Sequence, residues 1–181
     1  MRNAKLRFLA LTLILVSLVG GVLLGQYATI TDKDIGALKE DFFGKFQSGI
    51  STPAQANLTL IAFDAKPGID KSALGRWMRL WTNDAANLTQ GKEVIGAVNP
   101  GMEKNPARLT ATFGFGYELF KKVGIEWPLK ERTIPKFETI DQLEDRWSGG
   151  DVVVQICGDD PLSVFNLGVV LKKDAEPFAT M

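Results

Sequence analysis

The sequence predicts an α+β fold, and three observations support this prediction. Runs of strand character occur at 57–64, 108–115 and 151–157, and helical patterns follow the first and the last of them. A chain of 181 residues is long enough to form one domain with its own core. Its composition, 45% hydrophobic and 23% charged, is ordinary for a globular protein.

The first strand and helix are expected between residues 57 and 91. The run NLTLIAFD, 57–64, is apolar and predicts a buried strand. Asp70 is the expected N-cap of the helix that follows, and Gly91 is expected to close that helix. Apolar residues recur at helical spacing between these two positions, a pattern that is typical of a buried helix face and not of a cofactor-binding motif. They are Leu74, Trp77, Met78, Trp81, Ala85 and Leu88.

The second strand is expected at RLTATFGF, 108–115, because apolar and small residues alternate with polar ones. A short helix is expected from Tyr117 to Val123, and a further helical turn at Asp141–Trp147. The sequence GFGYEL does not predict a dinucleotide-binding loop, since the third glycine of that motif would fall at Leu119. The residues expected on one face of the strand are Leu109, Ala111, Phe113 and Phe115.

Two adjacent carboxylates, Asp159 and Asp160, follow the third strand in GGDVVVQICGDDP. A catalytic or metal-binding pair is one interpretation, but neither has a chemical partner nearby in the sequence. The favoured interpretation makes Asp160 the N-cap of a helix that begins at Pro161, where proline and a carboxylate both suit the first turn. Cys157, at the end of the apolar strand, is expected in the core rather than as a reactive thiol.

The order of these elements is β-α-β-β-α, which is a ferredoxin-like unit with its final strand missing. In that fold the fourth strand lies beside the first, so the edge near Leu58–Asp64 is expected to be unpaired. The last helix, LSVFNLGVVL, is apolar on most of its surface. Both features predict a partner or a continuation of the chain at this edge.

The amino-terminal part predicts export. Basic residues precede the apolar run Phe8–Gly25, which is about long enough to span a bilayer as a helix. We expect 1–28 to be a signal anchor or, alternatively, a signal peptide with a weak cleavage point at Ala28. A buried soluble helix is less favoured, because no polar face interrupts the run. Residues 29–52 are expected to form a tether, and 53–181 the incomplete domain.

The composition excludes several kinds of chemistry. The chain has no histidine, which excludes Ser-His-Asp and Cys-His nucleophiles, histidine-ligated zinc and a proximal histidine for haem. One cysteine excludes an internal disulfide and CxxC motifs. The formal net charge is zero, which does not favour a nucleic-acid partner. No catalytic, cofactor-binding or metal-binding residue is therefore predicted in this chain.

Three blocks carry a resemblance: FFGKFQSGISTPAQANLTLIAFD, LTATFGFGYELF and GGDVVVQICGDDP. Together they resemble the amino-terminal half of dye-decolourising (DyP-type) haem peroxidases, in the exported deferrochelatase/peroxidase branch associated with iron uptake. The resemblance covers roughly 42–175. It implies a protein of two ferredoxin-like halves, with haem b held mainly by the second. The implied proximal histidine, distal GxxDG aspartate and distal arginine have no matching positions in this sequence, so this chain alone is not expected to bind haem.

The sequence departs from the pattern of that family at three points. Folded export of the family usually follows a twin-arginine signal, whereas RNAKLRFLA has no Arg-Arg pair. Phe46 and Asn166 stand where histidines are common in the family. These departures indicate a divergent member or relaxed constraint.

Three functional hypotheses follow. The first is the front part of a DyP-type peroxidase, inactive alone, whose partner is a complementary C-terminal half or a second copy at the edge near Leu58–Asp64. The second is a membrane-tethered, non-enzymatic interaction module that uses the same edge for strand addition. The third, and least favoured, is a small-molecule or metal binder that uses surface carboxylates.

Overall fold

The computed structural model describes residues 32–95, 97, 101–129, 137, 139–142, 144 and 148–181. The chain divides after Ile35, and the larger of its two compact units is Gly36–Met181. The expected signal or anchor at 1–28, including Phe8–Gly25, lies outside the described residues. Among the residues that are described, none of the helices combines the length and apolar character needed to cross a bilayer.

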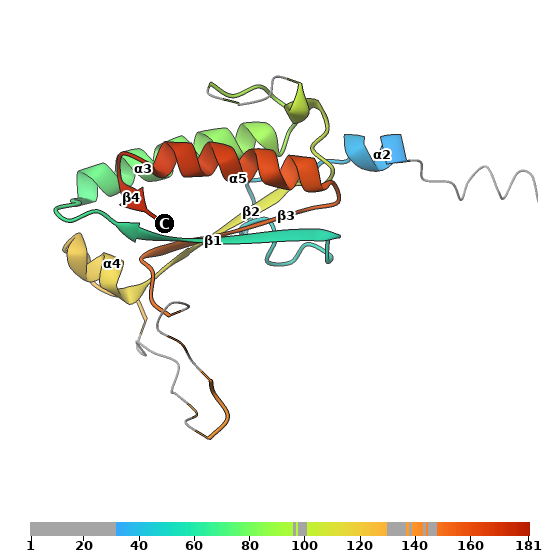
Figure 1. Ribbon diagram of the computed structural model, residues 1–181. Coiled ribbons are helices and arrows are strands. Elements are labelled where there is room, and N and C mark those ends of the chain that lie inside the picture. The colour runs from blue at the N-terminus through green and yellow to red at the C-terminus, as the bar shows by residue number, and fades with distance from the viewer. Residues whose placement is uncertain are drawn as a thin grey trace, which may run out of the picture. The chain divides into compact units, whose positions relative to one another are not determined.

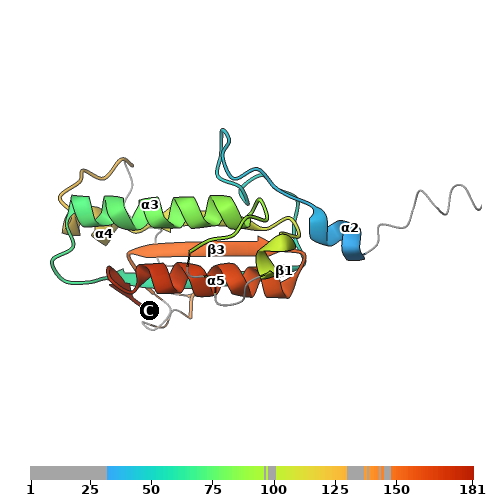
Figure 2. The same cartoon turned by 90° about the horizontal axis from the view of Figure 1, so that it is seen from above.

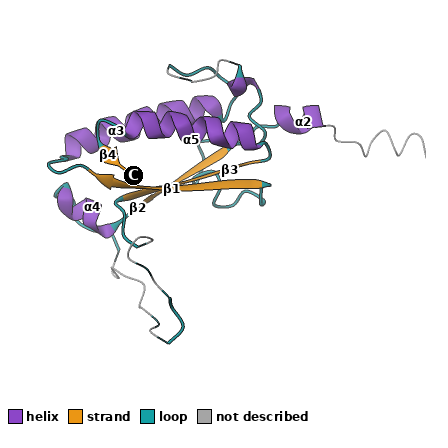
Figure 3. Ribbon diagram, in the orientation of Figure 1, coloured by secondary structure: helices purple, strands orange, loops and turns teal. Residues whose placement is uncertain are grey.

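Four strands form one antiparallel sheet in the order β2-β3-β1-β4. Helices α3 and α5 lie side by side over one face of this sheet (Figures 1 and 2). Figure 3 shows the same elements by type. Their bounds are α2 Asp32–Ala37, β1 Asn57–Ala65, α3 Lys71–Leu88, η1 Met102–Lys104, β2 Thr110–Phe115, α4 Tyr117–Lys122, β3 Val152–Gly158, α5 Pro161–Ala175 and β4 Ala179–Thr180.

This order confirms the ferredoxin-like α+β fold, with one correction. The final strand is not missing: β4 pairs Ala179 with Ala65 and Thr180 with Asp64. The strand is short, and Pro177, which cannot donate a backbone hydrogen bond, precedes it. A two-residue strand next to a proline carries no alternating pattern, which explains why the sequence did not predict it.

The core confirms the stripe expected on the first helix. Trp77 and Trp81 are buried on α3, and their ring centroids lie 4.9 Å apart in an edge-to-face arrangement. Phe63 of β1 contacts both rings. The indole N–H of Trp81 donates to the backbone carbonyl of Leu171 over 2.9 Å, so this ring also joins α3 to α5. Asp70 caps α3 as expected, accepting from the backbone N–H of Ala73.

The expectation of a buried strand at 57–64 is correct for one face of β1 only. Its residues alternate, so Ile61, Phe63 and Ala65 are buried beneath the helices. Leu58 and Leu60 point to the other face, and each is 62% exposed. The reason is the period of two along a strand, combined with helices that cover only one face of this sheet. The apolar run at 57–64 predicted a strand, but its sequence could not show that the face carrying Leu58 and Leu60 is exposed to solvent.

Strand β2 begins two residues later than expected. Ala107 and Arg108 have positive φ angles of 45° and 55°, which places them outside strand geometry. Leu109 and Ala111 are buried as expected, whereas Phe115, at the end of the same face, is 39% exposed. The predicted helix at 117–123 ends at Lys122. The turn expected at Asp141–Trp147 falls largely outside the described residues.

The outer edge of β2 is covered by a side chain. The amide of Gln47 accepts from the backbone N–H of Phe113 over 2.8 Å and donates to its carbonyl over 3.0 Å. Thr112 also donates from its hydroxyl to the carbonyl of Ser48. Gln47 and Ser48 belong to the segment 29–52, which therefore contacts the sheet at this edge. The assignment of that segment as a tether stays a prediction.

Candidate functional site

The structure places Asp160 at the start of α5, as the sequence predicted. Its carboxylate accepts from the backbone N–H groups of Leu162 and Ser163, over 3.3 and 3.1 Å. The hydroxyl of Ser163 donates to the same carboxylate over 2.8 Å. Three hydrogen bonds occupy this side chain, and all three serve the first turn of the helix. Asp160 is an N-cap.

Asp159 has a different role, which the sequence analysis missed. One oxygen accepts from the backbone N–H of Ala56 over 3.1 Å, and the other lies 3.1 Å from the guanidinium of Arg108. Arg108 also bonds Glu40 over 3.0 Å and the carbonyl of Pro53 over 3.2 Å. The hydrogen bond to Glu40 raises the pKa of Arg108, as do the nearby charges. Asp159 thus fixes the chain as it enters β1, and the two adjacent carboxylates make separate structural contacts.

Cys157 is buried, as expected for a core residue. Its backbone carbonyl faces the hydroxyl of Thr110 and the side-chain amide of Gln55 over 3.4 Å each. The thiol is 3.6 Å from the amide of Gln155. These contacts are those of a packed strand residue.

The fold brings together two carboxyl groups that are far apart in the sequence. Asp84 on α3 is only 6% exposed, and Asp174 on α5 lies close enough to interact with it. Burial and the neighbouring charge of Asp84 raise the pKa of Asp174 to about 7. Each residue looks like an ordinary surface carboxylate in its own helix, so no sequence signal indicated the pair. Among the described residues, no group of three or more His, Cys, Asp or Glu side chains could hold a metal ion.

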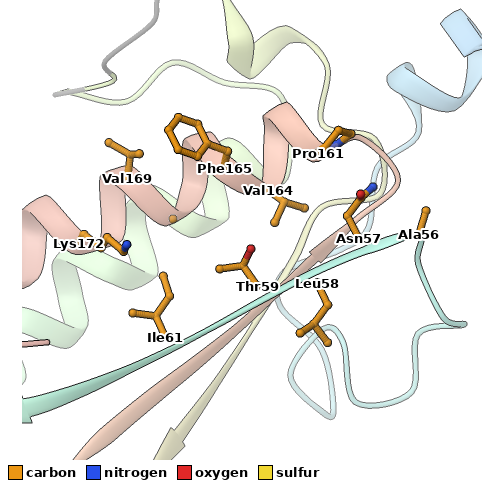
Figure 4. Close-up of a pocket in the computed structure, with 11 residues that line it drawn as sticks. Ala56, Asn57, Leu58, Thr59, Ile61, Pro161, Val164, Phe165, Val169 and Lys172 are labelled. Atoms are coloured by element: carbon orange, nitrogen blue, oxygen red, sulfur yellow. The ribbon is translucent and has the colours of Figure 1, made fainter.

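A groove lies between β1 and α5, with a cavity volume of about 370 Å³. Figure 4 shows Thr59 and Ile61 pointing from β1 toward α5, while Leu58 points to the opposite face. Phe165 is 60% exposed on the helix that forms the other wall. Lys172 is the charged residue of this lining. The complete lining is Ala56, Asn57, Leu58, Thr59, Ile61, Pro161, Val164, Phe165, Gly168, Val169 and Lys172. We call this surface the β1–α5 groove.

The fold and this groove define a class of protein: a ferredoxin-like α+β domain. In the part of the chain that the structure describes, its first strand is paired along only part of its outer edge. The family model "Dyp-type peroxidase, N-terminal" matches residues 47–175. The chain therefore belongs to the DyP-type peroxidase family and contains the N-terminal domain of that family. This confirms the resemblance drawn from the three sequence blocks.

Individual relatives, among them proteins of known structure, support the same family assignment. Deferrochelatase of Escherichia coli K12 is 35% identical over 134 residues, which is 67% of this chain and 31% of the relative. A DyP-type peroxidase from Cellulomonas bogoriensis has a TM-score of 0.77 at 34% identity and covers 81% of this chain. The oxyferrous complex of DtpA from Streptomyces lividans has a TM-score of 0.73 at 33% identity. The chain spans 41% of both solved chains and about a third of the deferrochelatase.

Haem binding is a property of the family, but the residues of this chain do not supply the implied ligand. Haem iron is commonly held by histidine, and less often by cysteine, methionine or tyrosine. The chain has no histidine, and its one cysteine is buried in the sheet. The β1–α5 groove is lined by none of these four residue types. The β1–α5 groove therefore offers no axial ligand for haem iron.

Proposed function

We propose that this chain is the N-terminal part of a DyP-type haem peroxidase and that it is inactive unless a complementary C-terminal half is joined to it. The observation that carries the proposal is the family match over 47–175, combined with the absence of histidine. The matched region is about a third of a deferrochelatase. The remaining two thirds of such a relative are the natural source of the haem ligands.

The reaction proposed for the joined protein is the peroxide-dependent oxidation of an organic substrate. Peroxide takes up two electrons and two protons and gives two molecules of water, while the substrate gives up the two electrons. The cofactor proposed for the joined protein is haem, and the family resemblance implies that it is haem b. Release of iron from haem is a second proposed activity, supported by the deferrochelatase relatives. In this scheme the present chain contributes a folded support, because it has no histidine to serve as the axial ligand.

A reconstitution experiment tests this proposal. The full chain, mixed with equimolar haemin, is expected to show no stoichiometric Soret band and no oxidation of a dye by hydrogen peroxide. Intact E. coli deferrochelatase treated in parallel is the positive control. A third sample contains this chain co-expressed with the region of that deferrochelatase that follows the 134 matched residues. Haem uptake above that of either piece alone is expected there. Stoichiometric haem and peroxide turnover by this chain alone would overturn the proposal.

A membrane-tethered interaction module without enzymatic activity is the second candidate. The exposed apolar residues of the β1–α5 groove favour it. The two candidates differ in the co-expression experiment: an interaction module is expected to leave haem uptake by the C-terminal region unchanged.

We also propose export and membrane anchoring through Phe8–Gly25, or release outside the cytoplasm if the signal is cleaved. The apolar sequence and the preceding basic residues support this location. The expected result is that the chain stays with membranes after alkaline extraction and is digested by protease added to the outside of spheroplasts. The Leu15→Arg variant, which places a charge in the apolar run, is expected to lose the membrane association. Extraction of the unaltered chain at alkaline pH, combined with full protease protection, would count against export.

A further inference from the structure

A short loop between α2 and β1 is held to the domain at both of its ends. At one end Phe42 packs against the core, and its ring centroid lies 6.5 Å from that of Phe113 on β2. At the other end the side-chain amide of Gln47 accepts from the backbone N–H of Phe113 and donates to its carbonyl. The residues between these two contacts, 43–46, lie outside the helices and strands. We call them the 43–46 loop.

The 43–46 loop presents two aromatic side chains to solvent. Phe43 is 71% exposed and Phe46 is 57% exposed, although phenylalanine is a residue type that is usually buried. Both rings line a groove of about 430 Å³ together with Met78 of α3. Because the backbone is held on both sides of the loop, the two rings are presented together at little further cost in conformational entropy. Exposed apolar surface of this kind marks a site of interaction.

Basic side chains accompany the two rings. The Nζ of Lys45 lies 5.3 Å from the centroid of the Phe46 ring. Arg79 of α3 lines an adjoining groove together with Phe43. Among the described residues that line these two grooves, none is acidic. The surface therefore combines apolar rings with positive charge.

The acidic residues nearest to the loop in the sequence do not cancel this charge. The carboxylate of Glu40 is bonded to the guanidinium of Arg108 over 3.0 Å. Asp41 is exposed, and Lys39, on the other side of Glu40, is exposed as well. The positive charge beside the rings thus comes from Lys45 and the side chain of α3.

A bilayer surface is the partner that this combination fits. Phenylalanine rings enter the boundary between headgroups and acyl chains, while the long stems of lysine and arginine carry their charges to anionic headgroups. The position of the loop in the sequence favours the same partner. It follows the proposed anchor Phe8–Gly25, and the intervening residues 26–42 span at most about 60 Å when extended. The loop therefore stays within reach of any bilayer that holds the anchor.

We propose that the 43–46 loop is a second membrane contact, in which Phe43 and Phe46 enter the headgroup region of an anionic bilayer. Lys45 and Arg79 bind the lipid phosphates beside the two rings. The inference rests on the proposed anchoring through Phe8–Gly25 and goes beyond it, because an anchor alone leaves the domain free to rotate. The contact turns toward the membrane the side of α3 that faces away from α5, where the first part of the segment between α2 and β1 lies (Figure 2).

The test reports the surroundings of the loop directly. The full chain carries the fluorophore NBD on a cysteine introduced by Gly44→Cys, and Cys157→Ala removes the native thiol. A Cβ at residue 44 meets only the carbonyl of Phe46, at 3.4 Å, so the label is tolerated. The chain is incorporated into vesicles of phosphatidylcholine and phosphatidylglycerol, and flotation of the vesicles measures anchoring. The fluorescence lifetimes separate label in lipid from label in water, and the lipid component is expected to dominate. The same label at Lys172→Cys, on α5, is expected to stay in water.

Matched substitutions show which side chains cause the insertion. Phe43→Ser and Phe46→Ser are each expected to lower the ratio of label in lipid to label in water about tenfold. Phe165→Ser, which removes a ring that is 60% exposed on α5, is expected to leave the ratio unchanged. Lys45→Glu is expected to lower the ratio about tenfold in these vesicles and to have little effect in vesicles of phosphatidylcholine alone.

A chain that floats with the vesicles while the label at residue 44 stays in water would overturn the inference and leave the anchoring intact. A chain that does not float would overturn both. Equal reductions by Phe46→Ser and Phe165→Ser would indicate unspecific adsorption and also count against the loop. A lipid-like lifetime that appears without vesicles as the protein concentration rises would identify a second copy as the occupant. No haem or peroxidase measurement enters this test, so it can fail independently of the proposed function.

Discussion

The guanidinium of Arg108 lies 3.1 Å from one oxygen of Asp159, and the other oxygen of Asp159 lies 3.1 Å from the backbone nitrogen of Ala56. One carboxylate therefore links the chain just before β2 to the residue before β1. Because Arg108 also bonds Glu40, the same cluster holds the segment that precedes the domain core. The relationship gives Asp159 a structural role where a catalytic one was an open interpretation.

Replacement of Arg108 tests this cluster. The Arg108→Met variant leaves Asp159 and Glu40 without their cation, and we expect the unfolding free energy to fall by about 1–2 kcal/mol. The expected change is modest because both carboxylates remain partly in contact with water. Urea denaturation followed by tryptophan fluorescence measures it. The control is Arg76→Met, whose exposed guanidinium bonds Ser72 one turn away, with an expected change below about 0.5 kcal/mol. Equal effects of the two substitutions would contradict the role given to Arg108.

Asp160 offers a second stability test. The Asp160→Ala variant removes the acceptor for the N–H groups of Leu162 and Ser163, and the expected loss is about 1 kcal/mol. Asp160→Asn keeps an acceptor of the same shape and is expected to recover most of that loss. Chemical denaturation of the three proteins side by side provides the measurement. If the asparagine variant were as unstable as the alanine variant, the charge rather than the cap geometry would be the important feature.

The two buried tryptophans of α3 form a matched pair. Trp81 donates its indole N–H to Leu171, whereas the indole N–H of Trp77 has no hydrogen-bond partner among the described residues. Both rings are almost fully buried. Trp81→Phe is therefore expected to destabilise the protein by about 1 kcal/mol more than Trp77→Phe, because only the first substitution removes a buried hydrogen bond. Thermal unfolding of both variants checks the difference, and a larger loss for Trp77→Phe would refute it.

Asp174 makes stability depend on pH. Its pKa is raised from 3.8 to about 7, by burial first and by Asp84 second. The folded state thus holds a proton that the unfolded state has released between pH 4 and pH 7, and stability falls as the pH rises through this window. The expected loss is about 1–2 kcal/mol, reduced from the full linkage value because the group is partly solvated.

The Asp174→Asn variant removes this titration. Its unfolding free energy is expected to lose the pH dependence that Asp174 contributes, and the variant is expected to be more stable than the unaltered chain at pH 8. The matched control is Asp64→Asn, which changes an exposed carboxylate at the β1–β4 pairing and is expected to keep the original pH profile. Denaturation midpoints at half-unit pH intervals give both curves. The mechanism would be contradicted if the stability of the unaltered chain rose between pH 4 and pH 7 while that of Asp174→Asn did not, because the predicted change is a fall.

Local sequence patterns predicted most of the fold. The Trp/Met stripe of α3 marked a helix, and its spacing placed Trp77 and Trp81 in the core. Asp70 and Asp160, each at the start of a helical pattern, were predicted as N-caps because capping depends on residues three or fewer positions away. Strand β4 was missed because two residues after Pro177 carry no pattern of their own.

The sequence by itself determined the family, the order of the elements and the lack of a histidine ligand, since these depend on residue identity and on neighbours along the chain. The tertiary structure decided which carboxylates meet. Asp159 reaches Arg108, and Asp84 reaches Asp174, only because the sheet and the helix pair bring distant segments together. It also decided which edge is open. Residues 58–62 form an apolar strand in any case. In the part of the chain that the structure describes, β4 pairs only with Asp64 and Ala65, so the outer backbone groups of 58–62 have no strand beside them. The local sequence does not predict this, because register sets the hydrogen-bond partners in a sheet.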